Sequence, residues 1–304
     1  MVTIRNLVKS YGGFRVLDGL DMNVGDGDVY GFLGKNGCGK STTMNILCNI
    51  IPKDGGDIIL GDDPQNKIRI GYLTETPALF GYMNGYEYLR YIAACSRYEG
   101  DVEARIREVL DIVGMTEGAK RKIQGYSRGM NQRLGIGAAI FYKPQLLVLD
   151  EPTSALDPQG RAEVMAIIRQ LTEMGCTIIL CTHILSDVER VANKIGIMKN
   201  GKMALEGEIS RILQDYSRSE IELTLYETLP ESVAKIKALE GTGAIRKVDF
   251  YEKTGVFVIR TDDCKASSLL LSQTAAKENI PIMRQQMVSE SLEQIYVKVV
   301  NGNA

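Results

Sequence analysis

The sequence contains one histidine among 304 residues and no tryptophan, and its six cysteines form no CxxC pair. A metal site built from clustered cysteine and histidine ligands is therefore not expected. The longest apolar runs, such as LLVL at 146–149, fall far short of the roughly 20 residues that cross a membrane. The formal net charge of −2 gives no sign of a basic surface, so no nucleic-acid partner is expected.

The remaining composition is that of an ordinary globular protein, with 44% hydrophobic and 24% charged residues. The opening MVTIRNLVKS lacks the apolar core of a signal peptide and runs directly into a strand-like pattern. The cysteines lie mostly in apolar surroundings, for which reduced thiols are the simplest account. We therefore expect a cytoplasmic protein with one large core and a second, smaller domain.

Residues 28–200 alternate strand-like runs with helical patterns. The runs DVYGFLG, QLLVLD and TIILC are continuously apolar, which is typical of strands covered by helices on both faces of a parallel sheet. The segments before them alternate polar and apolar residues and predict an antiparallel β element. Residues of about 80–142 are mainly helical. The sequence therefore predicts an α/β fold with a mainly parallel sheet, an antiparallel β element and a helical subdomain.

A different pattern begins after about residue 201. Three strand-like runs, IELTLY, IRKVDFYE and GVFVIRT, are separated by two helical stretches. We predict a first domain of residues 1–215 and a small α+β accessory domain of residues 216–304. Its last segment is expected to be a helix with Ser289 as N-cap. One face of that helix carries Leu292, Ile295, Tyr296 and Val299.

The stretch GFLGKNGCGKST, residues 31–42, follows a strand and opens a helix, as a phosphate-binding P-loop requires. Its glycines let successive N–H groups point at an anion, and the helix adds the positive end of its dipole. Lys40 is expected to reach the β- and γ-phosphates, and Ser41 to bind Mg²⁺. The alternative is a glycine turn that caps an ordinary helix. The predicted nucleotide-binding residues are Gly34, Asn36, Gly37, Cys38, Gly39, Lys40, Ser41 and Thr42.

The stretch QLLVLDEP places two carboxylates after a buried strand, at the end where α/β sheets bind ligands. Asp150 is placed to hold Mg²⁺, and Glu151 to polarise the attacking water as a general base. A pair of solvated acids at a strand end is the alternative. Together with the P-loop, the two acids predict ATP hydrolysis with Mg²⁺.

The order of these motifs resembles that of the ATP-binding subunits of ABC transporters, over residues 1 to about 215. YSRGMNQR resembles the signature motif of this family, with Ser127 and Gly129 matching and neighbouring positions departing from it. SALD resembles the D-loop, which ends here at Asp157. The segment KSYGGFRVLDGL resembles the one whose aromatic residue, here Tyr11, stacks on adenine. The resemblance implies that these residues bind the nucleotide.

The resemblance also assigns two residues beside the phosphates. The lone histidine, His183, falls where the family places a switch histidine that contacts the γ-phosphate. Glu75 stands where the family usually has glutamine, and we expect it to bind Mg²⁺, unless the register of the loop TET differs by one residue. The loop TPALFGYMNGYEYL is the candidate surface for a membrane partner. Its aromatic residues Phe80, Tyr82 and Tyr86 either contact that partner or pack internally.

The resemblance implies an ATPase whose two copies, or one copy and a related subunit, dimerise head to tail around ATP. Membrane-spanning transporter subunits would hold it at the inner face of the cell membrane. Glu75 and the YSxGM form of the signature resemble a bacterial subgroup, mostly exporters, that carries a similar C-terminal domain. The alternatives are a soluble ABC-type ATPase outside transport and a nucleotide-binding domain that signals without hydrolysis. The presence of both Glu151 and His183 argues against the second alternative.

Overall fold

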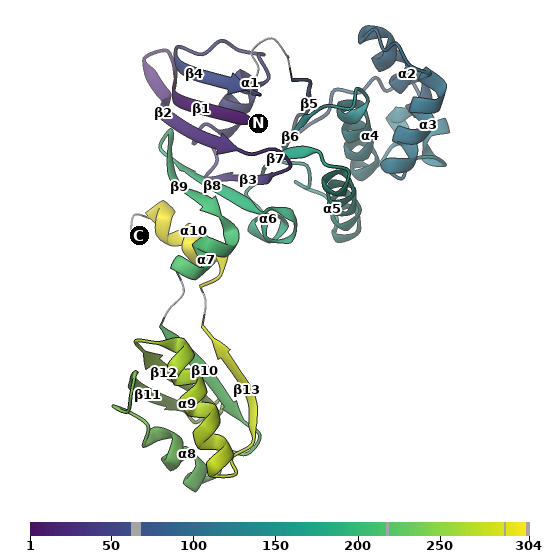
Figure 1. Cartoon of the computed structure of the whole chain (residues 1–304). Coiled ribbons are helices and arrows are strands. Elements are labelled where there is room, and N and C mark those ends of the chain that lie inside the picture. The colour runs from purple at the N-terminus through teal and green to yellow at the C-terminus, as the bar shows by residue number, and fades with distance from the viewer. Residues whose placement is uncertain (62–67, 217–218, 289, 302–304) are drawn as a thin grey trace. The chain divides into compact units, whose positions relative to one another are not determined.

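The computed structural model describes residues 1–61, 68–216, 219–288 and 290–301 (Figure 1). The chain divides into two compact units, Met1–Ile209 together with the residues from Tyr296 on, and Ser210–Ile295. This differs from the division expected from the sequence, which gave the whole C-terminus to the second domain. The end of the chain belongs to the first unit, where the Lys199 Nζ donates to the Val299 carbonyl at 3.2 Å.

A six-stranded sheet forms the centre of the first unit, in the order β5-β6-β7-β3-β8-β9. Neighbouring strands are parallel except β8 and β9, which form an antiparallel hairpin. Every residue of β3, β6 and β7 is buried, as their continuous apolar runs predict. The strands are β3 (Val29–Gly34), β5 (Ile70–Leu73), β6 (Leu146–Asp150), β7 (Thr177–Cys181), β8 (Lys194–Lys199) and β9 (Lys202–Glu208). The expected mainly parallel sheet is confirmed.

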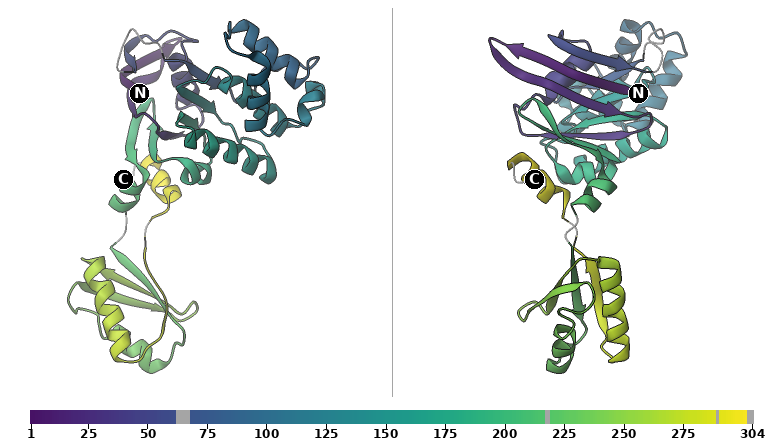
Figure 2. Two further views of the ribbon diagram at one scale, coloured as in Figure 1. Left: turned by 45° about the vertical axis from the view of Figure 1, so that its right-hand side comes forward. Right: turned by 60° about the vertical axis from the view of Figure 1, so that its left-hand side comes forward.

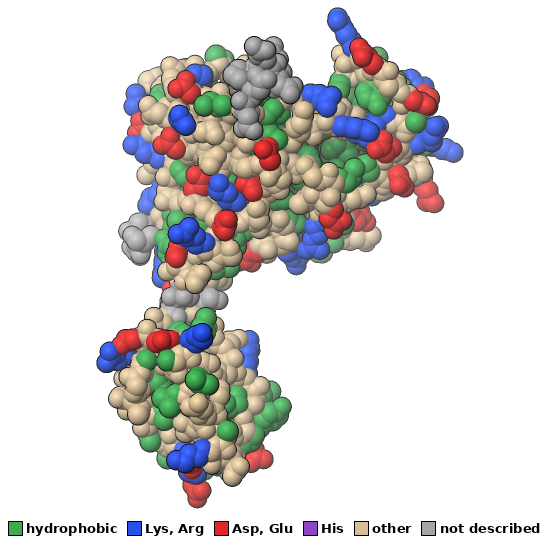
Figure 3. All heavy atoms as spheres, viewed as in Figure 1, with side chains coloured by type: hydrophobic (Ala, Val, Ile, Leu, Met, Phe, Trp, Pro, Cys, Tyr) green, Lys and Arg blue, Asp and Glu red, His purple; other side chains and the backbone are tan. Residues whose placement is uncertain are grey.

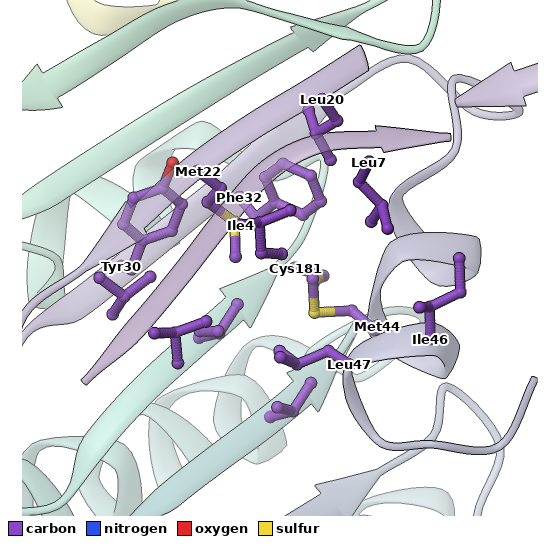
Figure 4. Close-up of a cluster of buried hydrophobic side chains, with 14 of the residues drawn as sticks. Ile4, Leu7, Leu20, Met22, Tyr30, Phe32, Met44, Ile46, Leu47 and Cys181 are labelled. Carbon is purple, nitrogen blue, oxygen red and sulfur yellow. The ribbon is translucent and has the colours of Figure 1, made fainter. Parts of the chain in front are cut away.

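A second, antiparallel sheet in the order β2-β1-β4 covers the first one (Figure 1). Its strands are β1 (Val2–Tyr11), β2 (Phe14–Val24) and β4 (Gly55–Leu60). The main core lies between this sheet, β3 and helix α1. Figure 4 shows how Phe32 of β3, Leu20 of β2 and Met44 of α1 converge in it. This core fixes β3 and α1 relative to each other, and the segment that joins them therefore has a defined path.

Helices follow the strands as the sequence predicts. The helices of the first unit's α/β part are α1 (Lys40–Leu47), α5 (Pro158–Glu173) and α6 (Leu185–Val191). A helical subdomain contains α2 (Gly85–Cys95), α3 (Val102–Ile112), the short η1 (Gly118–Lys120) and η2 (Ile123–Gly125), and α4 (Arg128–Ile140). Figure 2 shows α2 and α3 grouped at one end of this unit, beside α4. Helix α7 (Ile209–Asp215) follows β9.

The second unit has the element order β-α-β-β-α-β and a four-stranded antiparallel sheet in the order β11-β12-β10-β13. This is the ferredoxin-like arrangement. Its elements are β10 (Glu220–Leu225), α8 (Pro230–Lys237), β11 (Ile245–Tyr251), β12 (Val256–Thr261), α9 (Cys264–Lys277) and β13 (Ile282–Met287). Three of the four strands and both helices were predicted. The edge strand β13 was missed, because IMRQQM contains one β-branched residue and no alternating pattern.

The last helix, α10 (Leu292–Asn301), begins three residues after the expected N-cap. Ser289 itself lies outside the described residues. The Gln294 N–H donates to Ser291 Oγ, and the Ser291 N–H donates to Gln294 Oε1, both at 3.2 Å. Ser291 and Gln294 therefore form the capping box at the helix start.

Candidate functional site

The segment between β3 and α1 is a tight loop built on glycines. Gly37 and Gly39 have φ of 77° and 113°, values that other residues rarely adopt. Gly34 is required for space instead, because a Cβ there would lie 2.6 Å from Cys38 Sγ. Gly39 is the N-cap of α1 and has no side chain to cover the helix start. The first N–H groups of α1 are therefore left to an anionic ligand.

Among the described residues that line this site, Lys40 is the only lysine or arginine. Its side chain is buried, and its Nζ donates to the carbonyls of Gly34 at 2.7 Å and Lys35 at 3.4 Å. These bonds hold the ammonium at the base of the loop, where phosphate oxygens are the natural competing acceptors.

Two acids stand at the carboxyl end of β6, where Asp150 is the last residue of the strand and Glu151 follows it. Asp150 is buried and accepts a hydrogen bond from the Ser41 hydroxyl, which ties the end of β6 to the start of α1. Burial raises the pKa of Asp150, and the nearby Glu151 and Glu75 carboxylates raise it further, against the lowering effect of Ser41 and Lys40. Three acids therefore surround a single lysine, and the site carries excess negative charge.

Glu151 adopts a left-handed backbone conformation, with φ of 49°. Non-glycine residues in this region are strained, and such strain is concentrated at functional sites. The Glu151 N–H donates to the Cys181 carbonyl at 2.8 Å, which holds the turn against the end of β7. The carboxylate is thereby turned into the site.

The lone histidine meets Glu151 directly. His183 Nδ1 lies 3.0 Å from both Glu151 carboxyl oxygens, and the Thr182 hydroxyl donates to Oε2 at 3.2 Å. Thr182 is held in turn by the Ile184 N–H, which donates to its hydroxyl at 3.0 Å. The His183 side chain is 53% exposed and that of Glu151 11%. With Nδ1 engaged by the carboxylate, Nε2 is left for a ligand.

These groups line one cavity of about 570 Å³. Of the predicted phosphate-loop residues, Gly34 and Cys38 do not line it. Val16 and Ser154 line it and were not predicted. Ser154 begins the SALD stretch, which was the available signal, whereas nothing in Val16 marks it as a site residue. The cavity is lined by Tyr11, Val16, Asn36, Gly37, Gly39, Lys40, Ser41, Thr42, Glu75, Asp150, Glu151, Ser154 and His183.

Three predicted residues, Ser127, Gly129 and Asp157, lie instead at a second cavity of about 490 Å³. Ser127 is the N-cap of α4 and accepts from the Met130 N–H at 3.2 Å. Asp157 is the N-cap of α5 and accepts from the Gly160 N–H at 3.0 Å. Within one chain the structure does not bring these residues together with the phosphate loop.

Tyr11 ends β1 at the mouth of the first cavity. Its ring is 49% exposed, and Lys9 Nζ lies 5.4 Å from the ring centre. An exposed ring with a cation on one side is suited to stacking against a flat ligand on the other.

Oxygen donors for a metal come from three elements: the Ser41 hydroxyl and the Asp150 and Glu75 carboxylates. Hydroxyl and carboxylate oxygens are suitable ligands for Mg²⁺. In the described part of the chain, no three Asp, Glu, His or Cys residues are grouped closely enough to hold a metal ion. The donor set therefore fits a magnesium ion that takes its other ligands from phosphate and water.

The ABC transporter family model matches residues 17–154, which contain the phosphate loop, the helical subdomain and both acids. The bacitracin transport ATP-binding protein BcrA of Enterococcus faecalis is 32% identical over 99% of this chain and 97% of its own length. The chain belongs to the ATP-binding proteins of ABC transporters. As a member of this family, it binds ATP and hydrolyses it as a subunit of a transporter.

Two further similarities bear on this ATP-binding subunit. The linearmycin resistance ATP-binding protein LnrL of Bacillus subtilis is 36% identical over 68% of this chain and 69% of its own length. A solved ATP-binding subunit of an ABC transporter aligns with a TM-score of 0.63 and 26% identity, over 71% of this chain and 93% of that one. Among the described residues, no helix of the subunit is long and apolar enough to span a membrane.

Proposed function

We propose that this subunit powers an exporter, and that it does so as a head-to-tail pair with a second copy or a related subunit. The names of two relatives, for bacitracin transport and linearmycin resistance, favour export of a harmful compound. The observation that carries the proposed chemistry is the contact of Glu151 with His183 in the wall of the cavity that holds Lys40.

In the proposed reaction, the phosphate loop and Lys40 bind the phosphates. Water attacks the γ-phosphorus, the bond to the bridging oxygen breaks, and ADP leaves. Glu151 accepts the proton of the attacking water as general base. Thr182 and His183 fix its carboxylate, and the free Nε2 of His183 is available to the γ-phosphate. This assignment gives His183 two roles, because it orients the Glu151 carboxylate and contacts the γ-phosphate.

Mg²⁺, when bound, would neutralise charge on the β- and γ-phosphates. We assign its protein ligands to Ser41, Asp150 and Glu75. A glutamate at position 75 adds a negative charge where an amide would add none, so the site depends more strongly on the cation to hold a polyanion. Tyr11 is assigned to stacking on adenine, with Val16 beside it in the cavity wall.

The separation of the two cavities supports action across a pair of chains. Ser127 and Gly129 sit at the start of α4, where free N–H groups favour an anion, and the first turn has no acidic residue. We assign them, with Asp157, to the phosphates of ATP held by the other chain. Two complete sites would then form only in the closed pair, and ATP would favour that state by its differential affinity.

The proposed contact with membrane-spanning subunits lies on the helical subdomain. Phe80 stacks on Tyr82, with ring centres 5.7 Å apart, and meets Tyr91 edge-on at 5.3 Å. Tyr88 also joins this cluster, whereas Tyr86 does not take part in the ring contacts found among the described residues. Tyr82 and Tyr91 remain 67% and 41% exposed. Figure 3 shows hydrophobic side chains interspersed with charged ones on the visible face of this subdomain. Through this surface the protein would be held at the inner face of the membrane.

Substitution Glu151→Gln tests the proposed base, because the amide keeps the shape but cannot accept the proton. We expect ATP turnover to fall by about 10²- to 10⁴-fold while ATP binding persists, so that ATP-bound dimers accumulate. Light scattering after size-exclusion chromatography measures the dimer, and Glu173→Gln, at the exposed last residue of α5, is the matched control. Undiminished turnover would rule out Glu151 as the base.

Affinity purification of the tagged chain from detergent-solubilised membranes tests the transport role. A polytopic membrane protein that co-purifies and stimulates turnover is the expected result. A purely soluble partner, or full turnover without any partner, would instead identify a soluble ABC-type ATPase.

A further inference from the structure

The C-terminal helix α10 takes no part in the chemistry proposed above, although its residues from Tyr296 on belong to the unit that performs it. Its residues Val299 and Val300 are buried, Tyr296 is half-buried, and Val297 between them is 48% exposed. This spacing of i, i+3 and i+4 defines one packed helix face. Figure 1 shows α10, in yellow, beside the lower end of β9.

Lys199, the last residue of β8, holds this helix. Its Nζ donates to the Val299 carbonyl at 3.2 Å, across 100 residues of sequence. Val299 lies in the last turn of α10, whose carbonyls lack partners within the helix. A cation at that end is also favoured by the helix dipole. The contact therefore ties the C-terminal turn of α10 to the end of β8.

The end of β8 also packs directly against the phosphate loop. Met198 pairs with Gly34 in the parallel register of β8 and β3. A Cβ at Gly34 would lie 2.9 Å from the Met198 carbonyl oxygen, and one at Gly39 would lie 2.9 Å from Met198 Cε. Met198 thus touches both ends of the loop, and a shift of β8 is transmitted to it directly.

A second link runs through the middle of the loop. Cys38 Sγ is turned back toward Gly34, away from the nucleotide cavity. Burial raises the pKa of the Tyr296 hydroxyl, and the nearby Cys38 thiol raises it further. The packed face of α10 is therefore within electrostatic range of Cys38, while the hydrogen bond from Lys199 to Val299 fixes the helix to β8.

We propose that α10 braces the phosphate loop from the side opposite the nucleotide, with Lys199 and Tyr296 as positioning residues for ATP binding. The loop must present its N–H groups in a left-handed conformation at Gly37 and Gly39. A loop already held in that conformation loses less conformational entropy when ATP binds. The inference rests on the proposed role of Gly34–Thr42 as the phosphate loop.

Two substitutions in the full-length chain test the brace through ATP affinity. Lys199→Met removes the donor to Val299, and Tyr296→Ala removes the half-buried ring from the packed face of α10. We expect each to raise the Kd for ATP about 3- to 10-fold, while kcat at saturating ATP changes by less than about twofold. Val297→Ala on the exposed face of α10 and Lys202→Met on the next strand are the controls. All are measured well below the melting temperature of every variant.

The alkylation rate of Cys38, followed by peptide mass spectrometry without nucleotide, tests the geometry itself. Tyr296→Ala should raise this rate several-fold, because loss of the ring from the packed face of α10 would loosen the loop that keeps this half-buried thiol protonated and shielded. Tyr296→Phe should restore both the rate and the Kd. Equal rates and equal Kd values in Tyr296→Ala and Val297→Ala would overturn the brace. Unchanged ATP binding by Lys40→Ala would instead overturn the phosphate-loop role, so the two failures are distinguishable.

Discussion

Substitution Asp187→Asn tests a buried polar cluster beneath the nucleotide site. Asp187 on α6 is fully buried, and its Oδ1 accepts from Arg161 Nε at 2.7 Å. Its Oδ2 accepts from the Thr153 hydroxyl at 2.7 Å, and Arg161 also donates to Ser186. The carboxylate thus joins the loop after Glu151 to α5 and α6. No motif in the sequence marked it.

The expected cost follows from what asparagine cannot do. An amide has one accepting oxygen, so if that oxygen stays with Arg161, the NH₂ group faces the Thr153 hydroxyl, which must then turn to accept a hydrogen bond instead of donating one. The Arg161 side chain is 29% exposed and loses its ionic partner. We expect Asp187→Asn to destabilise the protein by about 3 kcal/mol. This value lies between the cost of losing a hydrogen bond to a charged group and the cost of breaking a buried ion pair. For a unit of this size, that lowers the melting temperature by about 6–12 °C.

Urea unfolding followed by circular dichroism measures this change. The two units can unfold in separate transitions. ATP binds the unit that contains Asp187, so the transition that ATP shifts is the unfolding of that unit. Asp111→Asn at the exposed end of α3 is the control and should change stability by less than about 0.5 kcal/mol. A cost below about 1 kcal/mol for Asp187→Asn, or additivity with Arg161→Met, would refute the reasoning, because contacting residues in one network are expected to couple.

Two further predictions concern the same edge of the sheet. Because the pKa of Asp150 is raised in the folded state, stability falls as pH rises through that pKa, and Asp150→Asn should remove this loss. Thermal melts without nucleotide should show a higher melting temperature for the variant at pH 7.5 and a smaller gain at pH 4.5. Ala155 has φ of 53°, so Ala155→Gly should stabilise the protein by about 0.5–1 kcal/mol in urea unfolding.

The chemistry of the site could be predicted from the sequence because its main elements are contiguous. The phosphate loop occupies one short stretch, and the neighbouring acids Asp150 and Glu151 end β6 and follow it, respectively. The ends of parallel strands meet at one edge of the sheet, so residues after β3, β6 and β7 had to lie near one another. The direct contact of Glu151 with His183 was not predicted, because the order of β6 beside β7 is a property of the fold.

Features that depend on distant partners were not predicted. The periodicity of α10 indicated a buried face but not what covers it, because Lys199 is 100 residues away from Val299. In the described part of the chain, β13 pairs only with β10, and its polar edge sequence carries little strand propensity. Both failures occur where tertiary contacts, rather than local preference, determine the structure.

The return of the chain to the first unit has a simple topological cause. In the second unit, the entering strand β10 and the leaving strand β13 are antiparallel neighbours, and Ile221 near the start of one pairs with Met287 at the end of the other. The chain therefore enters and leaves this unit at adjacent points, which is the condition under which one domain can be inserted into another. Helix α10 continues from β13, so it remains free to pack where the first unit offers a partner. Lys199 is that partner, because its Nζ donates a hydrogen bond to the Val299 carbonyl of α10. Lys199 directly follows Met198, which lies against the glycines of the phosphate loop. A ferredoxin-like insertion at this point thus adds a unit to the protein while leaving the last helix in place behind the nucleotide site.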